Sequence, residues 1–359
     1  MRIMFLISSL QSGGAERVIS TLTKEFIEHG DVVALSTFAS KQDDFFALPD
    51  QVIRYELGGL EETKSIHRAL FCNCLRIWRI HKATEDFQPD VLIAFLPETN
   101  VLAVLATLLG ARKVVVCERN LRNHKNLPML WRVLRKITYP RASAITANST
   151  EMKKFLEHAI KRPVIYLENP IRLPEKVRTH QPKGKVILSV GRLSEQKNFD
   201  LLIRSFCESK YHKAGWSLII IGEGTERQSL AKLIADLGIV DQVRLMGLSR
   251  SIDTYLREAS LFVLTSRYEG TPNAALEAMA SGVPVMATET CGEMQNILIN
   301  RFNGLLVPAN ESLIREKMDW ACENPNELVK LGKEGSLSVK KFEKTHVARK
   351  WREFLVSVK

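Results

Sequence analysis

The sequence lacks several features that would place it in a protein class at once. Its six cysteines form no CxxC pair and show no metal-ligand spacing, which is typical of reduced, mostly buried thiols in a cytosolic protein. No apolar run approaches the ~18 residues that a transmembrane helix needs. The sequence contains no internal repeats at solenoid periods and no low-complexity tracts, so a repeat architecture is excluded.

The first ten residues, MRIMFLISSL, are the stretch most similar to a targeting signal. They contain one basic residue and a short apolar run, and the following QSGGAER has no small-residue cleavage pattern. We therefore expect a first buried strand here rather than a signal peptide.

The composition is that of a globular protein with an excess of positive charge. The 359 residues are 45% hydrophobic and 25% charged, and this length suits about two domains. The 51 basic residues outnumber the 40 acidic residues and give a formal net charge of +11. Such an excess indicates an anionic partner, which is a nucleic acid, a phosphorylated substrate or a membrane surface.

Short apolar runs alternate with helical patterns along the chain, which predicts α/β layers on parallel sheets. Residues 1–170 form a first domain, and the proline-rich, basic stretch 171–185 is predicted to be a linker. The alternation restarts over 186–335, and 336–359 is predicted to be a basic helix that packs back across the domain boundary. Two doubly wound domains bind ligands at the carboxyl ends of their strands, so we expect the site in a cleft between them.

The expected strands follow the short apolar runs. They occupy 2–9, 32–38, 90–96, 113–118, 144–148 and 164–169 in the first domain and 186–193, 217–224, 243–248, 261–266, 283–289 and 304–308 in the second.

Two glycine-containing segments are candidate phosphate-binding turns. LQSGGAERV follows the first expected strand and opens a helix at Gly13-Gly14. Glycines there allow close backbone approach, and exposed helix N–H groups favour an anion, although a plain strand-to-helix turn explains the residues equally well. GEGTER, at 222–227, has two glycines of a dinucleotide fingerprint without the third, which is weak support for nicotinamide binding.

The segment VGRLSEQKN places two cations in a loop that follows a strand. Arg192 and Lys197 lie five residues apart, so the loop directs both toward the expected cleft. Two such cations grip a diphosphate and offset the charge that develops as it leaves. A solvated loop with incidental charges is the alternative for this segment taken alone.

The segment SRYEGTPNAALEAMASGVPV, at 266–285, carries two glutamates with seven residues between them. Pro272 suits the first turn of a helix whose N-terminus favours an anion. Glu269 precedes this helix and faces a sugar, whereas Glu277 lies within it and reaches the hydroxyls of a ribose. Two surface glutamates are the alternative, but they leave the small residues of the helix unexplained.

Taken together, Gly13-Gly14, GRLSEQKN, GEGTER and the two spaced glutamates resemble the retaining glycosyltransferases of family 4. The resemblance spans nearly the whole chain. It implies the GT-B fold, in which two Rossmann-like doubly wound parallel-sheet domains face a cleft.

The resemblance also implies a role for each matching residue. Arg192 and Lys197 neutralise the diphosphate of a UDP-sugar, and Glu269 lies against the donor sugar; these three are the expected catalytic residues. Glu277 binds the ribose, and Gly14 admits the donor phosphates. The remaining residues expected to bind the nucleotide-sugar are Glu223 and Leu248 near the uracil, with Gly270, Thr271, Pro272 and Asn273 at the helix N-terminus.

Within the family, the sequence looks like a transferase of bacterial N-linked glycosylation. The resemblance implies transfer of several alpha-1,4-linked N-acetylgalactosamine (GalNAc) units from UDP-GalNAc to an undecaprenyl-diphosphate-linked oligosaccharide. It also implies a location in the cytoplasm, peripheral to the inner membrane. The sequence has no D-x-D motif, so we expect no metal and no other cofactor.

Several alternatives stay open from the residues. Another family 4 transferase of lipopolysaccharide or capsule assembly would use a different UDP-sugar. An epimerase or phosphorylase shares the fold, but the phosphorylase needs a pyridoxal-binding lysine site and the hydrolysing epimerase lacks the two spaced glutamates. A non-catalytic UDP-binding protein of the membrane surface is the alternative from another class.

The first domain departs from the family where many members carry a functional histidine. The stretch VCERNLRNH has Glu118, Arg119 and Asn120 at the corresponding place, and His124 follows four residues later. Arg119 and Asn120 are therefore candidate acceptor-binding residues.

The excess of positive charge is concentrated in TKSIHRALFCNCLRIWRIHK, at 63–82, which contains no acid. On a helix its cations fall within an arc of about 120°, opposite an apolar face. A first-domain helix with a solvated basic face is one interpretation. The other is a helix that faces an anionic membrane and the diphosphate of a polyprenyl acceptor. The cations are Lys64, Arg68, Arg76, Arg79 and Lys82.

A second candidate membrane surface is LRNHKNLPMLWRVLRK, at 121–136, where Trp131 lies beside Arg132 and Arg135. No recognised nucleic-acid motif accompanies either basic segment, so we expect no nucleic acid as a partner.

Overall fold

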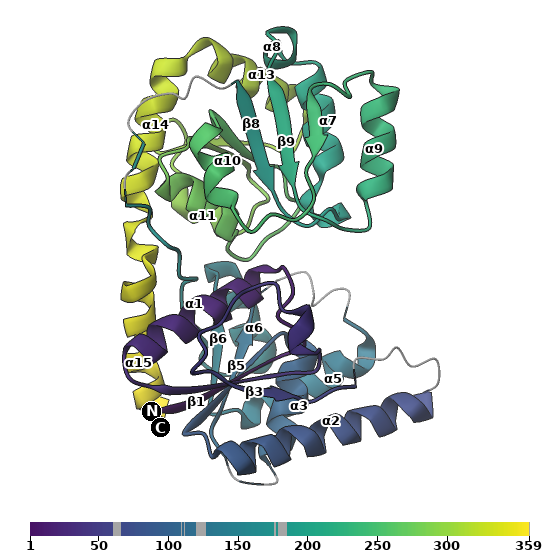
Figure 1. Ribbon diagram of the computed structural model, residues 1–359, viewed down its shortest axis with the longest axis vertical. Helices are drawn as coiled ribbons and strands as arrows, with labels where there is room; N and C mark the ends of the chain where they lie inside the picture. Colours follow the sequence, from purple (N-terminus) through teal and green to yellow (C-terminus); the bar gives the residue numbers. More distant parts are fainter. Residues whose placement is uncertain are drawn as a thin grey trace. The chain divides into compact units, whose positions relative to one another are not determined.

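The computed structural model describes residues 1–59, 66–108, 110, 112–119, 127–175, 177–178 and 185–358. The chain divides into two compact units, which are drawn in Figure 1. Unit 1 consists of Met1–Pro170 and Lys344–Lys359, and unit 2 consists of Ile171–Glu343. The expected residues Lys64 and Asn120 lie outside the described residues.

Unit 1 contains a parallel sheet with the strand order β3-β2-β1-β4-β5-β6-β7 within the described residues. The central strands are buried at almost every position because helices cover both faces of the sheet, as the continuous apolar runs predict. The strands are β1 (Arg2–Ile7), β2 (Val32–Thr37), β3 (Ile53–Glu56), β4 (Val91–Phe95), β5 (Val114–Glu118), β6 (Ala144–Ala147) and β7 (Ile165–Tyr166).

The helices of unit 1 form two layers around this sheet. Residues of α1 and α15 build one hydrophobic core, whereas residues of α2, α3 and α6 build the core of the opposite face. The helical elements are α1 (Gly14–Glu28), η1 (Lys41–Asp43), α2 (Ile66–Phe87), α3 (Pro97–Thr107), α5 (Met129–Thr138), η2 (Tyr139–Arg141), α6 (Thr150–Ile160) and α15 (Lys344–Val358).

Unit 2 contains a second parallel sheet, with the order β10-β9-β8-β11-β12-β13 within the described residues. It is wound in the same way as the first sheet, so the prediction of two doubly wound parallel-sheet domains is confirmed. The strands are β8 (Val186–Val190), β9 (Ser217–Ile221), β10 (Val243–Leu245), β11 (Leu261–Leu264), β12 (Val285–Thr288) and β13 (Leu305–Val307).

Helices also cover both faces of the unit 2 sheet, with α7, α9 and α13 on one hydrophobic core and α11 and α12 on the other. The helical elements are η3 (Glu195–Lys197), α7 (Phe199–Cys207), α8 (Lys210–Lys213), α9 (Arg227–Asp236), α10 (Ile252–Glu258), α11 (Asn273–Ala280), α12 (Met294–Ile297), α13 (Glu311–Glu323), α14 (Pro325–Ser338) and η4 (Lys340–Phe342).

The structure corrects the expected boundaries at two places. The final helix α15 begins at Lys344 rather than at residue 336, because Ser336–Ser338 still belongs to α14. Ile171, expected to begin a linker, is buried in a core of unit 2 and pairs with Glu343. The chain therefore passes from one unit to the other near Pro170 and returns near Lys344.

The C-terminal helix α15 is an integral part of unit 1. Trp351 is fully buried against α1 and the sheet, and its ring stacks on Phe95 with centroids 6.4 Å apart. Burial of a side chain of this size stabilises a fold by roughly 1.5–3 kcal/mol. Removal of α15 would therefore expose one face of the unit 1 sheet.

The strand order reverses between β1 and β4 in unit 1 and between β8 and β11 in unit 2. Doubly wound sheets bind ligands beyond the carboxyl ends of the strands at such a reversal. The loops that follow these strands are thus where a site is expected in each unit.

Candidate active site

In unit 2, the two loops at the reversal of strand order hold the charged residues singled out from the sequence. The loop after β8 carries Arg192 and Lys197, and the loop after β11 carries Glu269. Because β8 and β11 are adjacent parallel strands, their following loops meet at the same edge of the sheet.

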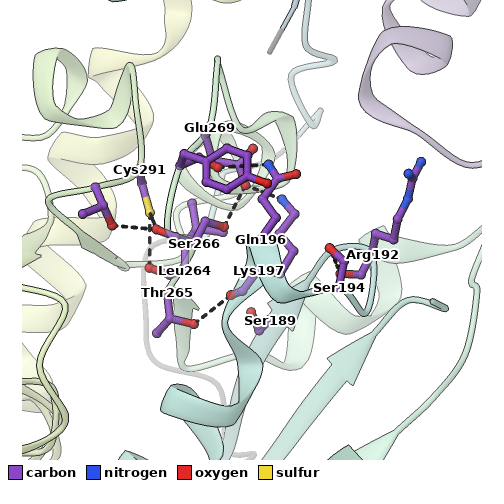
Figure 2. A network of polar contacts seen from close by, with 12 residues as sticks. Ser189, Arg192, Ser194, Gln196, Lys197, Leu264, Thr265, Ser266, Glu269 and Cys291 are labelled. Carbon is purple, nitrogen blue, oxygen red and sulfur yellow. Dashed lines mark hydrogen bonds and ion pairs between the residues drawn. The ribbon is translucent and has the colours of Figure 1, made fainter. Parts of the chain in front are cut away.

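The Nζ atom of Lys197 forms an ion pair with the Oε1 atom of Glu269, as Figure 2 shows. The lysine side chain is 16% exposed and the glutamate side chain is 10% exposed. Ser266 Oγ donates a second hydrogen bond of 2.7 Å to the same carboxylate oxygen. The partly buried carboxylate is thus held by one cation and one hydroxyl.

Hydrogen bonds fasten these two loops to each other. The Arg267 backbone N–H donates to the Gln196 carbonyl oxygen at 2.8 Å, and the Gln196 side-chain amide donates to the Tyr268 carbonyl oxygen at 2.9 Å. Thr265 Oγ1 lies 3.2 Å from the Lys197 carbonyl oxygen. Lys197 and Glu269 are therefore presented by a single connected structure rather than by two independent loops.

A cluster of polar side chains holds the Ser266 carbonyl oxygen just beyond the end of β11, with Thr288 and Cys291 buried and Thr290 exposed. The Ser266 carbonyl oxygen accepts from Thr290 Oγ1 at 2.7 Å, from Thr288 Oγ1 at 3.1 Å and from Cys291 Sγ at 3.5 Å. Burial raises the pKa of the Cys291 thiol to about 12. The thiol therefore stays protonated at neutral pH and acts as a hydrogen-bond donor. The spacing of the cysteines in the sequence did not reveal this role of Cys291.

Arg192 lies apart from this ion pair. Its side chain is exposed, and Figure 2 shows it extending away from Lys197 and Glu269. The structure thus brings together one of the two expected cations with the glutamate.

The loops after β9 and β10 carry Glu223 and Leu248, which were expected near a uracil. Glu223 pairs with Arg227 at 2.7 Å, and Leu248 is exposed. Gly222 joins the two loops, because its N–H donates to the Gly247 carbonyl oxygen at 2.8 Å.

The backbone at Gly222 leaves no room for a side chain. Its φ is +151°, and a Cβ atom at this position would lie 1.8 Å from the Gly191 carbonyl oxygen. The first glycine of GEGTER, Gly222, is thus needed for the close approach of the loop after β9 to the loop after β8.

Helix α11 begins at Asn273, with Pro272 as its N-cap residue rather than within its first turn. Gly270 lies beside this N-terminus, and its carbonyl oxygen accepts from the Glu293 N–H at 2.9 Å. Glu277 is on the helix and Thr271 precedes it, and both side chains are largely buried. The segment has the local form of an anion-binding helix N-terminus next to Glu269.

In unit 1, α1 begins at Gly14 after β1, as expected. The carboxylate of Glu16 folds back over the helix N-terminus, because a Cβ atom on Gly13 would lie 2.1 Å from its Oε2 atom. A phosphate that reached the Gly14 N–H would have to displace this carboxylate.

The loop after β4 in unit 1 begins with an unusual backbone conformation. Leu96 has φ +77° and ψ 146°, a region that residues with side chains rarely adopt. This conformation leads directly into α3 at the reversal of strand order.

Glu118 ends β5 and is fully buried, which the sequence did not indicate. It accepts a hydrogen bond from Tyr139 Oη, and the Arg135 Nη1 atom lies 4.0 Å from its Oε1 atom. Burial raises the pKa of Glu118 to about 7 despite the nearby Arg135. Asn100 completes the cluster by donating to Tyr139 Oη at 2.9 Å.

Arg119 was expected to contact an acceptor, but its guanidinium is enclosed within unit 1. It donates to Asn169 Oδ1 at 3.1 Å and lies over the rings of Phe95 and Trp351. Burial lowers its pKa. These contacts tie the end of β5 to α15, and the acceptor role expected for Arg119 stays a prediction.

The expected cations of helix α2 lie in two different surroundings. Arg76 donates to the Gly59 carbonyl oxygen and Arg79 to the Leu57 carbonyl oxygen, so both turn toward the chain after β3. Arg68 and Lys82 are exposed, with Lys82 lying over the Trp78 ring at 5.4 Å. Leu70, Phe71 and Trp78, expected on the apolar face, are exposed. Helical periodicity alone could not reveal the carbonyl acceptors beyond β3.

Among the described residues, no cluster of three or more histidine, cysteine, aspartate or glutamate side chains could hold a metal ion. No helix in the described part of the chain is long and apolar enough to span a bilayer.

Two family matches divide the chain at the same place as the structure. Residues 12–173 match the family described as Glycosyltransferase Family 4, and residues 173–337 match Glycosyl transferases group 1. Together they span most of the chain. The chain belongs to glycosyltransferase family 4.

Two relatives of this family 4 transferase come from Campylobacter jejuni. One is named GalNAc-alpha-(1->4)-GalNAc-alpha-(1->3)-diNAcBac-PP-undecaprenol alpha-1,4-N-acetyl-D-galactosaminyltransferase; it is 24% identical, and the match covers 100% of this chain and 99% of that enzyme. The other is N-acetylgalactosamine-N,N'-diacetylbacillosaminyl-diphospho-undecaprenol 4-alpha-N-acetylgalactosaminyltransferase, 26% identical over 99% of each chain.

The fold of this family 4 transferase also resembles a solved structure. Anabaena HepE in complex with UDP-glucose has a TM-score of 0.83 and 16% identity, over 99% of this chain and 100% of that chain. The GT-B fold expected from the sequence is thereby confirmed.

Proposed function

We propose that this family 4 transferase moves GalNAc from UDP-GalNAc onto an undecaprenyl-diphosphate-linked oligosaccharide. We further propose that it adds several alpha-1,4-linked units, with retention of configuration and without a metal. The names of the two full-length C. jejuni relatives support this choice of sugar and acceptor. The donor nucleotide is supported by the likeness of the fold to HepE bound to UDP-glucose.

The observation that carries the proposal is the Lys197–Glu269 ion pair at the reversal of strand order in unit 2. A lysine there offsets negative charge on a departing diphosphate without a metal. The glutamate beside it lies within reach of a sugar attached to that diphosphate. This combination suits the transfer of a glycosyl group from a nucleoside diphosphate.

We propose that Glu269 orients the donor sugar instead of attacking it. Its Oε1 atom is already engaged by Lys197 and Ser266, which reduces its strength as a nucleophile. The bond between sugar C1 and the β-phosphate oxygen then breaks, and its electron pair leaves with UDP. The acceptor hydroxyl forms the new bond on the same face, and its proton passes to the leaving phosphate.

The surrounding residues complete the donor site in this proposal. Lys197 and the long, exposed side chain of Arg192 contact the diphosphate. The N-terminus of α11 adds the positive end of its helix dipole. Glu277 binds the ribose from within α11. The other proposed donor contacts are Glu223 and Leu248 for the base, Gly14 for the phosphates, and Gly270, Thr271, Pro272 and Asn273 at the start of α11.

We propose that unit 1 receives the acceptor. Its exposed cations on α2 include Arg68 and Lys82, whereas Arg76 and Arg79 would exchange a carbonyl acceptor for a diphosphate oxygen. An anionic lipid diphosphate gains charge-assisted hydrogen bonds in such an exchange. Cytoplasmic location at the face of the inner membrane belongs to the same proposal.

The test is transfer with one donor at a time. Purified protein is incubated with a lipid-diphosphate-linked oligosaccharide, EDTA and a single UDP-sugar, and the products are weighed by mass spectrometry. Successive additions of N-acetylhexosamine with UDP-GalNAc alone are expected. Products with another donor only would indicate a different family 4 transferase, such as one of lipopolysaccharide or capsule assembly. UDP binding without any product would support the non-catalytic alternative, and loss of transfer in EDTA would contradict metal independence.

A further inference from the structure

Helix α5 exposes apolar side chains where a surface helix ordinarily carries polar ones. Met129 is 73% exposed, Leu130 58%, Val133 44% and Ile137 51%. At about 100° per residue these four side chains occupy one arc of about 100° on the helix. We call these four residues the apolar ridge. Contiguous exposed apolar residues of this kind mark an interaction surface.

The opposite side of α5 holds a buried charge. Arg135 is buried next to the carboxylate of Glu118, and its guanidinium lies 6.0 Å from the centre of the Phe155 ring. Trp131 and Leu134 pack against the hydrophobic core on the same side. Helix α5 thus buries one arginine on its inner side and exposes four apolar side chains on its outer side. Rotation of the apolar ridge inward would take the Arg135 charge away from Glu118.

Positive charge borders the apolar ridge. Arg132 and Lys136 are exposed on α5, and Arg141 is exposed immediately after it. No aspartate or glutamate occurs between Leu127 and Arg141. An apolar strip with a cationic border complements a surface whose outer layer is anionic and whose inner layer is hydrocarbon.

We propose that the apolar ridge inserts into the boundary between headgroups and acyl chains of an anionic bilayer, with Arg132 and Lys136 at the lipid phosphates. The helix has ten residues and is about 15 Å long, so it lies in the plane of the interface. This surface differs from α2, where Arg76 and Arg79 already donate to backbone carbonyls.

A bilayer suits the charges better than a second copy of this chain. Two copies joined by a two-fold axis would bring the same patch together, and Arg132 and Lys136 would then face like charges. Four side chains on a short helix also provide less area than the ~800 Å² per partner of a stable protein interface. A fluid bilayer requires no matching surface of that size.

Vesicle flotation of the full-length chain tests the proposal without any need for turnover, so it remains informative if the proposed transfer reaction fails. The probe is a vesicle of phosphatidylethanolamine and phosphatidylglycerol. We expect the double substitution Val133→Ser and Ile137→Ser to lower the partition coefficient at least about tenfold, because two aliphatic side chains no longer enter the bilayer. Val356→Ser is the matched control, since Val356 is exposed on α15, a helix whose buried residues belong to the other hydrophobic core of unit 1.

The cationic border is tested with Arg132→Gln and Lys136→Gln. Each substitution is expected to weaken binding to phosphatidylglycerol vesicles by about fivefold and to reduce the dependence on salt. Binding to neutral phosphatidylcholine vesicles should not change. Lys232→Gln, on the exposed side of α9, is the matched control.

Two outcomes would overturn the proposal. One is undiminished vesicle binding by the folded variant with Val133→Ser and Ile137→Ser. If Phe71→Ser with Trp78→Ser abolished binding instead, the membrane surface would be α2. The other is a change in the oligomeric state of the protein in solution when the apolar ridge is substituted, while vesicle binding is retained. That result would make the apolar ridge a protein interface. Circular dichroism establishes that each variant is folded.

Discussion

Each unit places an acidic residue near a cation at the carboxyl end of a parallel sheet, but the two pairs differ in their surroundings. In unit 2, Glu269 lies in the loop beyond β11 and contacts Lys197 directly. In unit 1, Glu118 is the last residue of β5, and the closest approach of Arg135 is 4.0 Å. Glu269 remains partly exposed, whereas Glu118 is fully buried.

The comparison teaches that position at a strand end does not define a functional acid. Glu118 is still within the register of the sheet, opposite Ala147, so helices cover it together with the strand. Desolvation then raises its pKa to about 7. Glu269 lies beyond the last pair of β11 and escapes that cover. A charged residue becomes useful to a ligand when the loop carries it past the layers of the sheet.

The largest effect should come from breaking the unit 2 pair. We expect Glu269→Gln or Lys197→Gln to lower kcat by about a hundredfold to a thousandfold, as removal of a preorganised charge does in other active sites. Steady-state kinetics with a saturating donor measures the loss. Glu208→Gln is the control, because Glu208 pairs with Arg315 at an exposed position. Equal activity in the two variants would remove Glu269 and Lys197 from the mechanism.

The loop platform of unit 2 should be nearly as sensitive. Gly222→Ala places a methyl group against the Gly191 carbonyl oxygen and is expected to lower the free energy of unfolding by about 3 kcal/mol. Gly238→Ala is the control, because its φ is +68° but nothing lies within 4 Å of the added atom. Urea denaturation compares the two variants. A larger loss in Gly238→Ala would mean that backbone conformation, not close approach, determines the cost.

The unit 1 pair, Glu118 and Arg135, should affect the pH dependence of stability instead of catalysis. The pKa of Glu118 is about 7 in the folded protein and near 4.5 in the unfolded chain, so the folded state binds the extra proton between these values. Stability therefore falls as pH rises from 4.5 to about 7, by on the order of 2 kcal/mol. Glu118→Gln should flatten this slope, and denaturation at several pH values measures it.

The control for this slope is Glu85→Gln, since Glu85 forms an exposed pair with Arg112. The slope is the relevant quantity, because Glu118→Gln also changes the contacts with Arg135 and Tyr139 and so shifts stability itself. A slope unchanged by Glu118→Gln would show that other groups cause the pH dependence.

The smallest effect concerns the hydroxyl that supports Glu269. Ser266→Ala removes the 2.7 Å hydrogen bond to the carboxylate while Lys197 stays in place, so kcat should fall by about tenfold. The KM for the donor should change less than kcat, because the hydroxyl positions Glu269 and does not contact the substrate. Ser229→Ala, an exposed position on α9, is the control. A loss confined to stability would make Ser266 purely structural.

Most strands were predictable because each is a continuous apolar run between turn signals. Strand β3 was missed, since Ile53–Glu56 has no buried residue and its pattern resembles a surface segment. Helices α13 and α14 were not predicted, although Asn310 caps α13 by accepting a hydrogen bond from the Leu313 N–H.

The sequence by itself determined that the chain forms two parallel-sheet domains and that Lys197 and Glu269 each lie in a loop after a strand of the second domain. Apolar periodicity and glycine positions are local properties, so the amino-acid sequence alone reveals them. The tertiary structure alone decided that Ser266 supports Glu269, that the Arg119 guanidinium lies over the rings of Phe95 and Trp351, and that four apolar side chains of α5 are exposed. Each of these depends on where the folded backbone places a side chain, and neither apolar periodicity nor glycine spacing contains that information.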